Sequence, residues 1–375
     1  MQYRNFGKSD FKVSALSFGC MRLPCDENGR VKDDESIKMI RYAIDNGVNY
    51  LDSAYVYHEG YSEVVTGKAL KNGYRNKVKI ATKLPMWSVE TSGDFDKFLD
   101  EQLKRFETDV IDYYLFHALG NESWEKVLKL DLIDKAEKVL KAGKINHIGF
   151  SFHDHADAFK KIIDGYDKWD FCQVQYNYMD IENQAGSEGV RYASGKGIPV
   201  IVMEPLLGGR LANPPANISK IWSDYDKNKS AVYWALKWLW SQKEVTTVLS
   251  GMSDMEQLEE NLKAADDAME NSMKPDELNL IEEIRSMYIA QFPISCTKCN
   301  YCMPCPSGVN IPGNMEFYNN GISHDDMPGA QFSYRKFFPD EMKANQCTQC
   351  KLCEEKCPQK IEISDWMIKI HKALG

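Results

Sequence analysis

Hydrophobic and polar positions follow a regular order along residues 1–290. Short apolar or β-branched runs, typical of buried strands, alternate with longer stretches whose apolar residues recur every three or four positions, as in amphipathic helices. The predicted strands cover residues 15–18, 50–52, 78–82, 110–116, 147–151, 171–175, 199–202 and 245–249. The predicted helices lie near residues 34–46, 63–71, 94–106, 134–142, 156–164, 185–195, 230–241, 255–268 and 275–290.

Repeated strand–helix units of this kind are expected of an α/β fold around a parallel sheet. Eight strands, each followed by a helix, predict a closed TIM (β/α)8 barrel over residues 1–290. An open doubly wound sheet is the alternative, and we prefer the barrel because no G-x-G-x-x-G follows the first strand. In such a barrel the chemistry lies at the carboxyl ends of the strands.

Charge and hydropathy narrow the classes of partner. The chain of 375 residues has 46 Lys and Arg against 55 Asp and Glu, a net charge of −9. An acidic surface repels nucleic acid and anionic membranes, so neither is an expected partner. No apolar run reaches the roughly 18 residues of a membrane span, and the first residues lack the apolar segment of a secretory signal. A cytoplasmic protein is therefore expected.

Cysteine is concentrated at the carboxyl end of the chain. Eight of the eleven cysteines lie in the last eighty residues, in two C-x2-C-x2-C runs that are each followed by a Cys-Pro pair. Cytosolic thiols stay reduced, so this clustering favours metal or cluster ligation over disulfides. Residues 291–375 are therefore predicted to form a second domain. A short tether, Phe292–Ser295, favours docking of this domain over free swinging.

The cysteine segment resembles a bacterial two-cluster ferredoxin over about residues 291–365. The resemblance implies a small helical and loop-rich iron–sulfur domain with two [4Fe-4S] clusters, suited to electron transfer. It implies one cluster on Cys296, Cys299, Cys302 and Cys357, and another on Cys347, Cys350, Cys353 and Cys305. The first motif departs from the ferredoxin pattern, with two residues where three usually precede the fourth cysteine. A pair of structural zinc sites is the alternative, although zinc needs only C-x2-C pairs and leaves the third cysteines unexplained.

Four polar residues lie at the ends of three predicted strands or soon after them: Asp52 and Tyr57 in LDSAYVYHEG, Lys83 in IATKLP, and His117 in DYYLFHAL. Each alone has an ordinary structural explanation, but together they form a set able to move a proton. In these motifs, and in SFGCMRLP and GFSFH, the chain resembles the aldo-keto reductase family over most of residues 1–265. The resemblance implies an oxidoreductase that interconverts small carbonyl and alcohol substrates by hydride transfer from NADPH or NADH.

Chemistry explains why these residue types belong together. A free tyrosine, with a pKa near 10, is a weak acid at neutral pH unless a neighbouring cation eases its ionisation. Tyr57 is the expected proton donor, with Lys83 as the cation and Asp52 as the carboxylate that holds Lys83. His117 would donate to the substrate oxygen. Tyr55 is the second choice for the donor.

The resemblance also implies positions for the nicotinamide cofactor: Ser151 and Gln173 on the carboxamide, Gly19 and Met21 beside the ribose, and Glu260 with Asn261 at the adenine. Met203 and Glu204 stand where an aromatic residue usually stacks on the ring. Gly251 and Gln257 stand where a Lys and an Arg usually bind the 2′-phosphate, so the choice between NADPH and NADH stays open.

Three functions fit these features. The first is an aldo-keto reductase with an added cluster domain. In the second, a flavin couples the barrel to the clusters and to an external ferredoxin or similar carrier, because a hydride carries two electrons and each cluster accepts one. The sequence shows no flavin motif. The third is a redox-sensing or interaction module without catalysis.

Overall fold

The computed structural model describes residues 1–7, 9–323 and 326–375. The chain forms two compact units, each of which combines separate stretches of sequence. The barrel unit comprises Met1–Leu206 and Val232–Met273, and the C-terminal unit comprises Leu207–Ala231 and Lys274–Gly375. The segment between the seventh and eighth barrel strands thus groups with the C-terminal residues. The predicted domain boundary at residue 290 stays a prediction.

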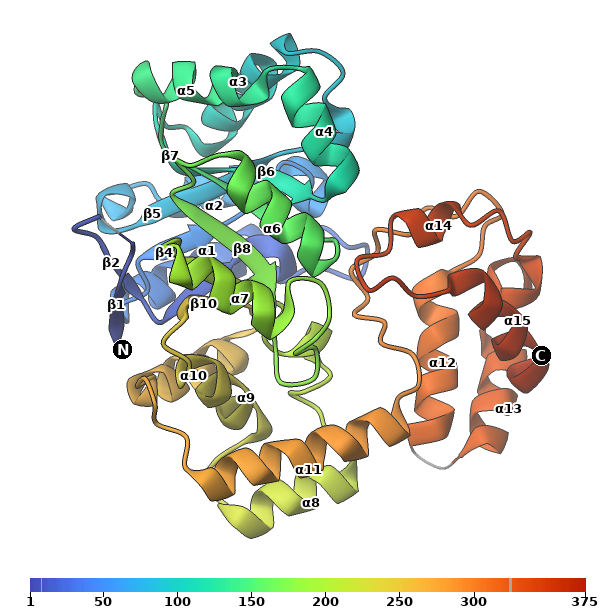
Figure 1. The fold of residues 1–375 in the computed structure, drawn as a ribbon. Coiled ribbons are helices and arrows are strands. Elements are labelled where there is room, and N and C mark those ends of the chain that lie inside the picture. The colour runs from blue at the N-terminus through green and yellow to red at the C-terminus, as the bar shows by residue number, and fades with distance from the viewer. Residues whose placement is uncertain (8, 324–325) are drawn as a thin grey trace. The chain divides into compact units, whose positions relative to one another are not determined.

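Eight parallel strands close into a barrel, as predicted from the sequence pattern (Figure 1). Each strand pairs with its neighbours along the chain, and pairing of Val248 with Leu16 completes the ring. The strands are β3 (Leu16–Gly19), β4 (Tyr50–Asp52), β5 (Lys79–Leu84), β6 (Ile111–Leu119), β7 (Ile145–Phe152), β8 (Phe171–Gln175), β9 (Val200–Met203) and β10 (Val245–Gly251).

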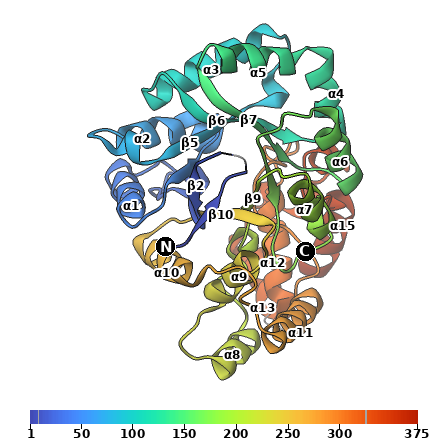
Figure 2. The same ribbon diagram turned by 60° about the vertical axis from the view of Figure 1, so that its left-hand side comes forward.

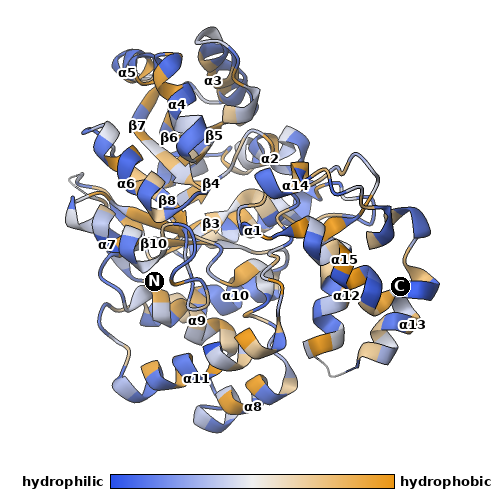
Figure 3. Ribbon diagram, turned by 45° about the vertical axis from the view of Figure 1, so that its right-hand side comes forward, coloured by the Kyte–Doolittle hydropathy of each residue, from blue (hydrophilic) through white to orange (hydrophobic). Residues whose placement is uncertain are grey.

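Helices surround these strands, and Figure 2 shows α1 to α7 arranged around the sheet. Their apolar faces are buried and their polar faces exposed, and the hydropathy colouring of Figure 3 alternates along them. The helices of this layer are α1 (Asp33–Asp45), α2 (Tyr61–Ala69), α3 (Gly93–Phe106), α4 (Asn121–Lys129), α5 (Leu132–Lys141), α6 (Ala156–Gly165), α7 (Gly186–Gly195), α9 (Ala231–Trp240) and α10 (Met255–Ala264). The sequence pattern predicted all of these except α4.

An antiparallel hairpin precedes the barrel and was not predicted. It consists of β1 (Tyr3–Asn5) and β2 (Lys12–Ser14). Phe6, which directly follows β1, is buried against aromatic residues at the starts of barrel strands, including Tyr50 and Phe171. Because the amino-terminal end of the barrel is packed in this way, the carboxyl ends of the strands are left to form a site.

The C-terminal unit is helical, and its helices enclose a core of their own. They are α8 (Ala216–Tyr225), α11 (Pro275–Gln291), α12 (Ile311–Ser323), α13 (Met327–Phe337), α14 (Leu352–Glu355) and α15 (Ile363–Leu374). Val309, Met315, Tyr334 and Met367 are buried together, with several cysteines packed against them. Tyr225 of α8 donates a hydrogen bond to Asp276 of α11 at 2.7 Å, which ties the two stretches of this unit together. None of the helices in the described ranges is long and apolar enough to cross a membrane.

Candidate active site

The ammonium of Lys83 is the centre of the candidate site. Its Nζ lies 2.5 Å from Oδ1 of Asp52, 2.6 Å from the carbonyl oxygen of Ser53 and 3.4 Å from the hydroxyl of Tyr57. Lys83 and Asp52 are fully buried. The structure therefore brings together three of the four residues predicted to carry the chemistry.

His117 completes the set through its ring contacts. Its ring lies edge-on to that of Tyr57, with 6.1 Å between centroids. The pairing of β6 with β7 shifts register between Phe116 and Leu119, and Ala118 in this interval has a left-handed backbone. Such a bulge re-aims a side chain at the end of a strand. The irregular end of β6 thus places His117 beside the proton-donor candidate.

Strand ends determine this arrangement. Asp52 is the last residue of β4 and pairs with Ala81 of β5, two residues before Lys83. Tyr57 follows five residues after Asp52, in a short 3-10 turn. Because parallel strands end at the same face of the barrel, residues far apart in sequence meet there.

Burial controls the protonation of the site. Burial raises the pKa of Tyr57 well above 10, and the charge of Asp52 adds to this effect. Burial also raises the pKa of the Asp52 carboxyl, which the Lys83 ammonium opposes. The pKa of His117 lies well below 6.5, because of burial and the Lys83 charge. At neutral pH the site therefore holds a protonated tyrosine and an uncharged histidine.

Tyr55, the second choice for the donor, is held elsewhere. Its hydroxyl donates to Oε2 of Glu101 at 2.9 Å, and the Arg105 guanidinium lies 4.1 Å from its ring centroid. Of the two candidate donors, only Tyr57 has its hydroxyl beside Lys83. This distinction depends on three-dimensional packing, so the sequence alone left it open.

A buried polar network supports β5 from behind, and sequence analysis missed it. The side-chain amide of Gln102 donates to Glu63 at 2.7 Å, to Thr82 at 3.0 Å and to the carbonyl oxygen of Lys83 at 3.1 Å. The hydroxyl of Tyr114 donates to the Gln102 oxygen at 2.8 Å. These bonds fix the backbone from which Lys83 extends.

Trp87 is a second residue that the sequence analysis missed. It follows β5, is half exposed, and its ring lies 4.9 Å from that of His117. An aromatic surface next to the proton-handling residues gives an apolar wall for a substrate. The signal in the sequence was its place four residues after Lys83, at a strand end.

The predicted carboxamide contacts lie side by side on two neighbouring strands. Ser151 of β7 and Gln173 of β8 are paired in register and buried. Oε1 of Gln173 is buried with no hydrogen-bond partner among the described residues. Ser151 accepts from the backbone N–H of Ala118 at 2.8 Å and keeps its own proton to donate. An unsatisfied acceptor beside an available donor fits a carboxamide group.

The other predicted cofactor residues lie at the ends of β3, β9 and β10 and on α10. Gly19 ends β3 and pairs with Gly251 at the end of β10, and Met21 follows in the 3-10 turn Cys20–Arg22. Met203 is the last residue of β9, and Glu204 follows it with a left-handed backbone. On α10 lie Gln257, Glu260 and Asn261.

Two of these positions bear on recognition of a phosphate. The side chain of Gln257 donates to Asp254 at 2.7 Å and accepts from the backbone N–H of Ser253 at 3.0 Å, so it serves the start of α10. A Cβ atom on Gly251 would lie 3.3 Å from the side chain of Arg22. The missing side chain at Gly251 thus leaves room for the stem of an arginine from another element.

The cysteines of the first motif surround a small cavity within the C-terminal unit. Its wall includes the cysteines Cys296, Cys299, Cys302 and Cys357, together with apolar residues such as Ile311 and Met315. Burial raises the pKa of Cys302 to about 12, and the other three thiols add to the effect, as expected of sulfur atoms gathered at close range. These four cysteines are the set implied by the ferredoxin resemblance for one cluster.

The cysteines of the second motif form a second group, together with Cys305. Burial raises the pKa of Cys353 to about 11, with Glu354, Cys347 and Cys305 adding to the effect. Cys350, between them in the sequence, is exposed. In the ranges that the structure describes, no three His, Cys, Asp or Glu side chains converge closely enough to hold a single metal ion. A four-iron cube has no such requirement, because each of its thiolates binds a different iron.

Comparison with known proteins identifies both parts. The Aldo/keto reductase family model matches residues 15–286. The chain belongs to the aldo/keto reductase family. It is therefore an oxidoreductase, and the expected family membership is confirmed. A model described as a 4Fe-4S dicluster domain matches residues 295–362, which confirms that this aldo/keto reductase carries an iron–sulfur domain.

Individual relatives agree with this assignment. L-galactose dehydrogenase of Arabidopsis thaliana is 27% identical over 305 residues, covering 76% of this chain and 94% of that protein. A probable aldo-keto reductase of Glycine max is 33% identical over 153 residues, 39% of this chain and 43% of its own length. An aldo-keto reductase from Klebsiella pneumoniae, solved in complex with NADPH, shares the fold with a TM-score of 0.63 and 21% identity, covering 76% and 95% of the two chains.

Proposed function

We propose that this aldo/keto reductase interconverts a small carbonyl compound and its alcohol by hydride transfer, with Tyr57 as the proton donor. The observation that carries the proposal is the position of the Lys83 ammonium, which contacts Asp52 and lies 3.4 Å from the Tyr57 hydroxyl. A carbonyl oxygen that receives negative charge needs a proton at once, and a tyrosine next to a cation supplies it.

Each residue of the site has a distinct task. Asp52 holds Lys83 in place through a buried ion pair, which is costly to break because one charge would remain unpaired. Lys83 stabilises the phenolate that Tyr57 becomes after it gives up its proton. His117 is uncharged at neutral pH, so it orients the substrate oxygen with a neutral N–H donor.

The cofactor of the proposal is NADPH or NADH, which supplies the hydride when bound. The buried, unpaired oxygen of Gln173 and the hydroxyl of Ser151 fit its carboxamide. The Klebsiella pneumoniae neighbour was solved with NADPH, which supports the same class of cofactor here. The side-chain stem of Arg22 lies 3.3 Å from the place that a Cβ atom on Gly251 would take, so a cation stands beside the position that usually carries the lysine.

The test compares two tyrosines two residues apart. In Tyr57→Phe we expect carbonyl reduction to fall by about 10²-fold or more, the usual contribution of a positioned general acid. Cofactor binding, followed by quenching of tryptophan fluorescence, should persist. Tyr55→Phe is the matched control, because its hydroxyl bonds Glu101 and not Lys83.

Two results would contradict the proposal. Turnover by Tyr57→Phe at the rate of the unmodified protein would exclude Tyr57 as the donor, and equal losses in both variants would mean that the effect is structural. Intact cellular behaviour of Tyr57→Phe would instead favour the alternative of a non-catalytic sensing module.

We also propose two [4Fe-4S] clusters, one on Cys296, Cys299, Cys302 and Cys357, the other on Cys305, Cys347, Cys350 and Cys353. The cavity lined by the first four cysteines supports the first cluster. Iron and acid-labile sulfide in anaerobically purified protein should each approach eight atoms per chain, since each cluster holds four of both. Stoichiometric zinc without sulfide would favour structural zinc sites instead.

The exposure of Cys350 favours a second candidate function. A cluster ligated near the surface can exchange electrons with an external ferredoxin or similar one-electron carrier. A flavin would then be needed between hydride and clusters, because hydride carries two electrons. Titration of the anaerobic protein with NADPH, and separately NADH, distinguishes the two: bleaching of the cluster absorbance supports this relay, and unchanged absorbance while the cofactor binds supports a reductase that works alone.

A further inference from the structure

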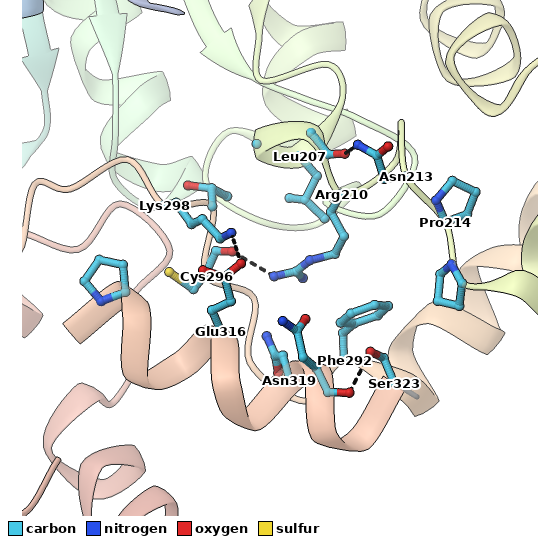
Figure 4. Close-up of a pocket in the computed structure, with 16 residues that line it drawn as sticks. Leu207, Arg210, Asn213, Pro214, Phe292, Cys296, Lys298, Glu316, Asn319 and Ser323 are labelled. Carbon is cyan, nitrogen blue, oxygen red and sulfur yellow. Dashed lines mark hydrogen bonds and ion pairs between the residues drawn. The ribbon is translucent and has the colours of Figure 1, made fainter. Parts of the chain in front are cut away.

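A loop in the C-terminal unit contacts the segment that carries the first cysteine motif. The loop, Leu207–Arg210, begins four residues after β9 ends, and it contacts the segment Ile294–Lys298. Together they form part of the wall of a pocket of about 300 Å³, shown in Figure 4. All of these residues belong to the same compact unit.

Arg210 makes the main contacts. Its Nη2 donates to the carbonyl oxygen of Cys296 at 2.7 Å and to that of Ile294 at 3.2 Å, and Figure 4 shows the guanidinium directed at this segment. The guanidinium also lies 5.0 Å from the centre of the Phe292 ring. The carbonyl oxygen of Arg210 accepts from the hydroxyl of Tyr288, so the residue is held at both its side chain and its backbone.

Gly208 brings the loop close enough for these contacts. Its φ is +66°, and a Cβ atom there would lie 2.4 Å from the carbonyl oxygen of Thr297. No other residue type allows the two backbones to approach in this way. The loop is therefore shaped to meet the segment that carries Cys296.

The charge of Arg210 is held on a residue that ligates the cluster. Its guanidinium donates to the backbone carbonyl oxygen of Cys296 at 2.7 Å, so the positive charge is fixed at the residue that carries one of the ligand sulfurs. A cation that stabilises negative charge on a cluster ligand also stabilises the extra negative charge that the cluster acquires on reduction.

We propose that Arg210 is a positioning residue that raises the reduction potential of the cluster bound by Cys296 relative to the cluster of the second motif. The inference rests on the proposed pair of clusters. The step it concerns is the gain of one electron by a [4Fe-4S] cluster from a one-electron reductant. No bond forms or breaks, and the cluster becomes more negative by one charge.

Anaerobic redox titration with dithionite, followed by electron paramagnetic resonance, measures both clusters in one sample. Arg210→Gln keeps an N–H donor but loses the charge. In this variant we expect the reduction potential of one of the two clusters to fall by about 59 mV or more, which is at least a tenfold change in the equilibrium constant for one-electron reduction. The other couple should not move and acts as an internal reference. In Arg210→Lys, which keeps the charge, the couple should stay closer to that of the unmodified protein. Lys220→Met is the matched control, because Lys220 is an exposed cation on α8, paired with Asp224.

The possible outcomes are separable. Unmodified protein without iron and sulfide would contradict the proposed clusters themselves. With full iron content, an unmoved couple in Arg210→Gln, or equal movement of both couples, would overturn the role of Arg210. If Arg210→Gln loses iron, the variants Arg210→Lys and Arg210→Met decide. The inference requires that Arg210→Lys retains iron and that its cluster has a higher reduction potential than that of any Arg210→Met protein that contains iron. Loss of iron from Arg210→Lys, or the reverse order of the two potentials, overturns the inference.

Discussion

At the scale of the residue, the candidate active site shows how burial sets the chemistry of ordinary side chains. Lys83 is fully buried, and its Nζ has a carboxylate, a carbonyl oxygen and a phenol as partners. An ammonium without water must find such partners, since an isolated buried charge is very costly. The same contacts that stabilise Lys83 place a cation beside the Tyr57 hydroxyl.

The raised pKa of Tyr57 predicts the pH dependence of both directions of the reaction. Because burial keeps the pKa well above 10, Tyr57 stays protonated from neutral pH to about pH 9, and carbonyl reduction should be flat over this range. Alcohol oxidation needs the phenolate, whose fraction rises about tenfold per pH unit below the pKa, so oxidation should rise steeply with pH. Profiles of kcat/KM in the two directions check this.

The lowered pKa of His117 predicts what the same profiles should lack. His117 gains a proton only well below pH 6.5, so no inflection near 6.5 should appear in reduction. A fall in reduction centred near neutral pH would contradict the assignment of Tyr57 as a donor with a raised pKa.

At the scale of the element, the strand ends position the site and the helices behind them hold it in place. Gln102 of α3 links α2, through Glu63, to the carbonyl oxygen of Lys83 on β5. Every polar atom of the Gln102 side chain has a partner. Such a fully bonded buried network fixes a unique packing of helix on strand.

Gln102→Leu should expose the importance of this network. The change leaves the hydroxyl of Tyr114 and the carbonyl oxygen of Lys83 without a partner, which should lower the free energy of unfolding by about 2 kcal/mol or more. Urea denaturation measures the difference. Asp100→Asn on the same helix is the control, because Asp100 is exposed and its ion pair with Lys144 contributes little. Equal stability of both variants would show that the network is dispensable.

The elements that the sequence predicted are those with a strong period. The eight barrel strands were predicted because they are apolar runs bounded by polar helices, and burial on both faces requires that composition. The hairpin β1–β2 escaped prediction because each strand has only three residues, with exposed positions in both. Helix α4 escaped prediction because it is a second helix between β6 and β7, where one helix after each strand already accounted for the pattern.

The site was predictable only in part, for a related reason. Asp52, Tyr57, Lys83 and His117 follow strand ends, and strand ends can be found from the sequence. Gln102 lies in the middle of a helix, where nothing in the pattern marks it. Its role arises from convergence with residues from three other elements, which only the folded chain shows.

At the scale of the whole molecule, two compact units share one chain, and they depend on different forces. The barrel unit is a packed apolar core closed by strand pairing. In the C-terminal unit, the cysteine segments between helices are irregular, with isolated left-handed residues such as Lys298 and Lys351. Ligand bonds to clusters would stabilise these segments, as metal binding does in small metal-dependent domains.

Removal of the clusters should therefore affect the two units unequally. After treatment with an iron chelator and an oxidant, we expect amide hydrogen exchange to accelerate at least tenfold across residues 296–305 and 347–357. Protection of β5 and β6 should remain unchanged, because their bonds do not involve the clusters. The same exchange experiment on untreated protein is the control. Uniform acceleration over the whole chain would contradict this prediction.

The grouping of Leu207–Ala231 with Lys274–Gly375 has a consequence for synthesis on the ribosome. The chain emerges from its amino end, so Leu207–Ala231 leaves the ribosome before any of the residues in its partner stretch exist. Gly208 and Arg210 therefore have no contacts with Thr297 and Cys296 until that later segment has been synthesised. Vectorial synthesis therefore makes the C-terminal unit the last to assemble, and a truncated chain that ends after α10 would leave Leu207–Ala231 permanently without its partner.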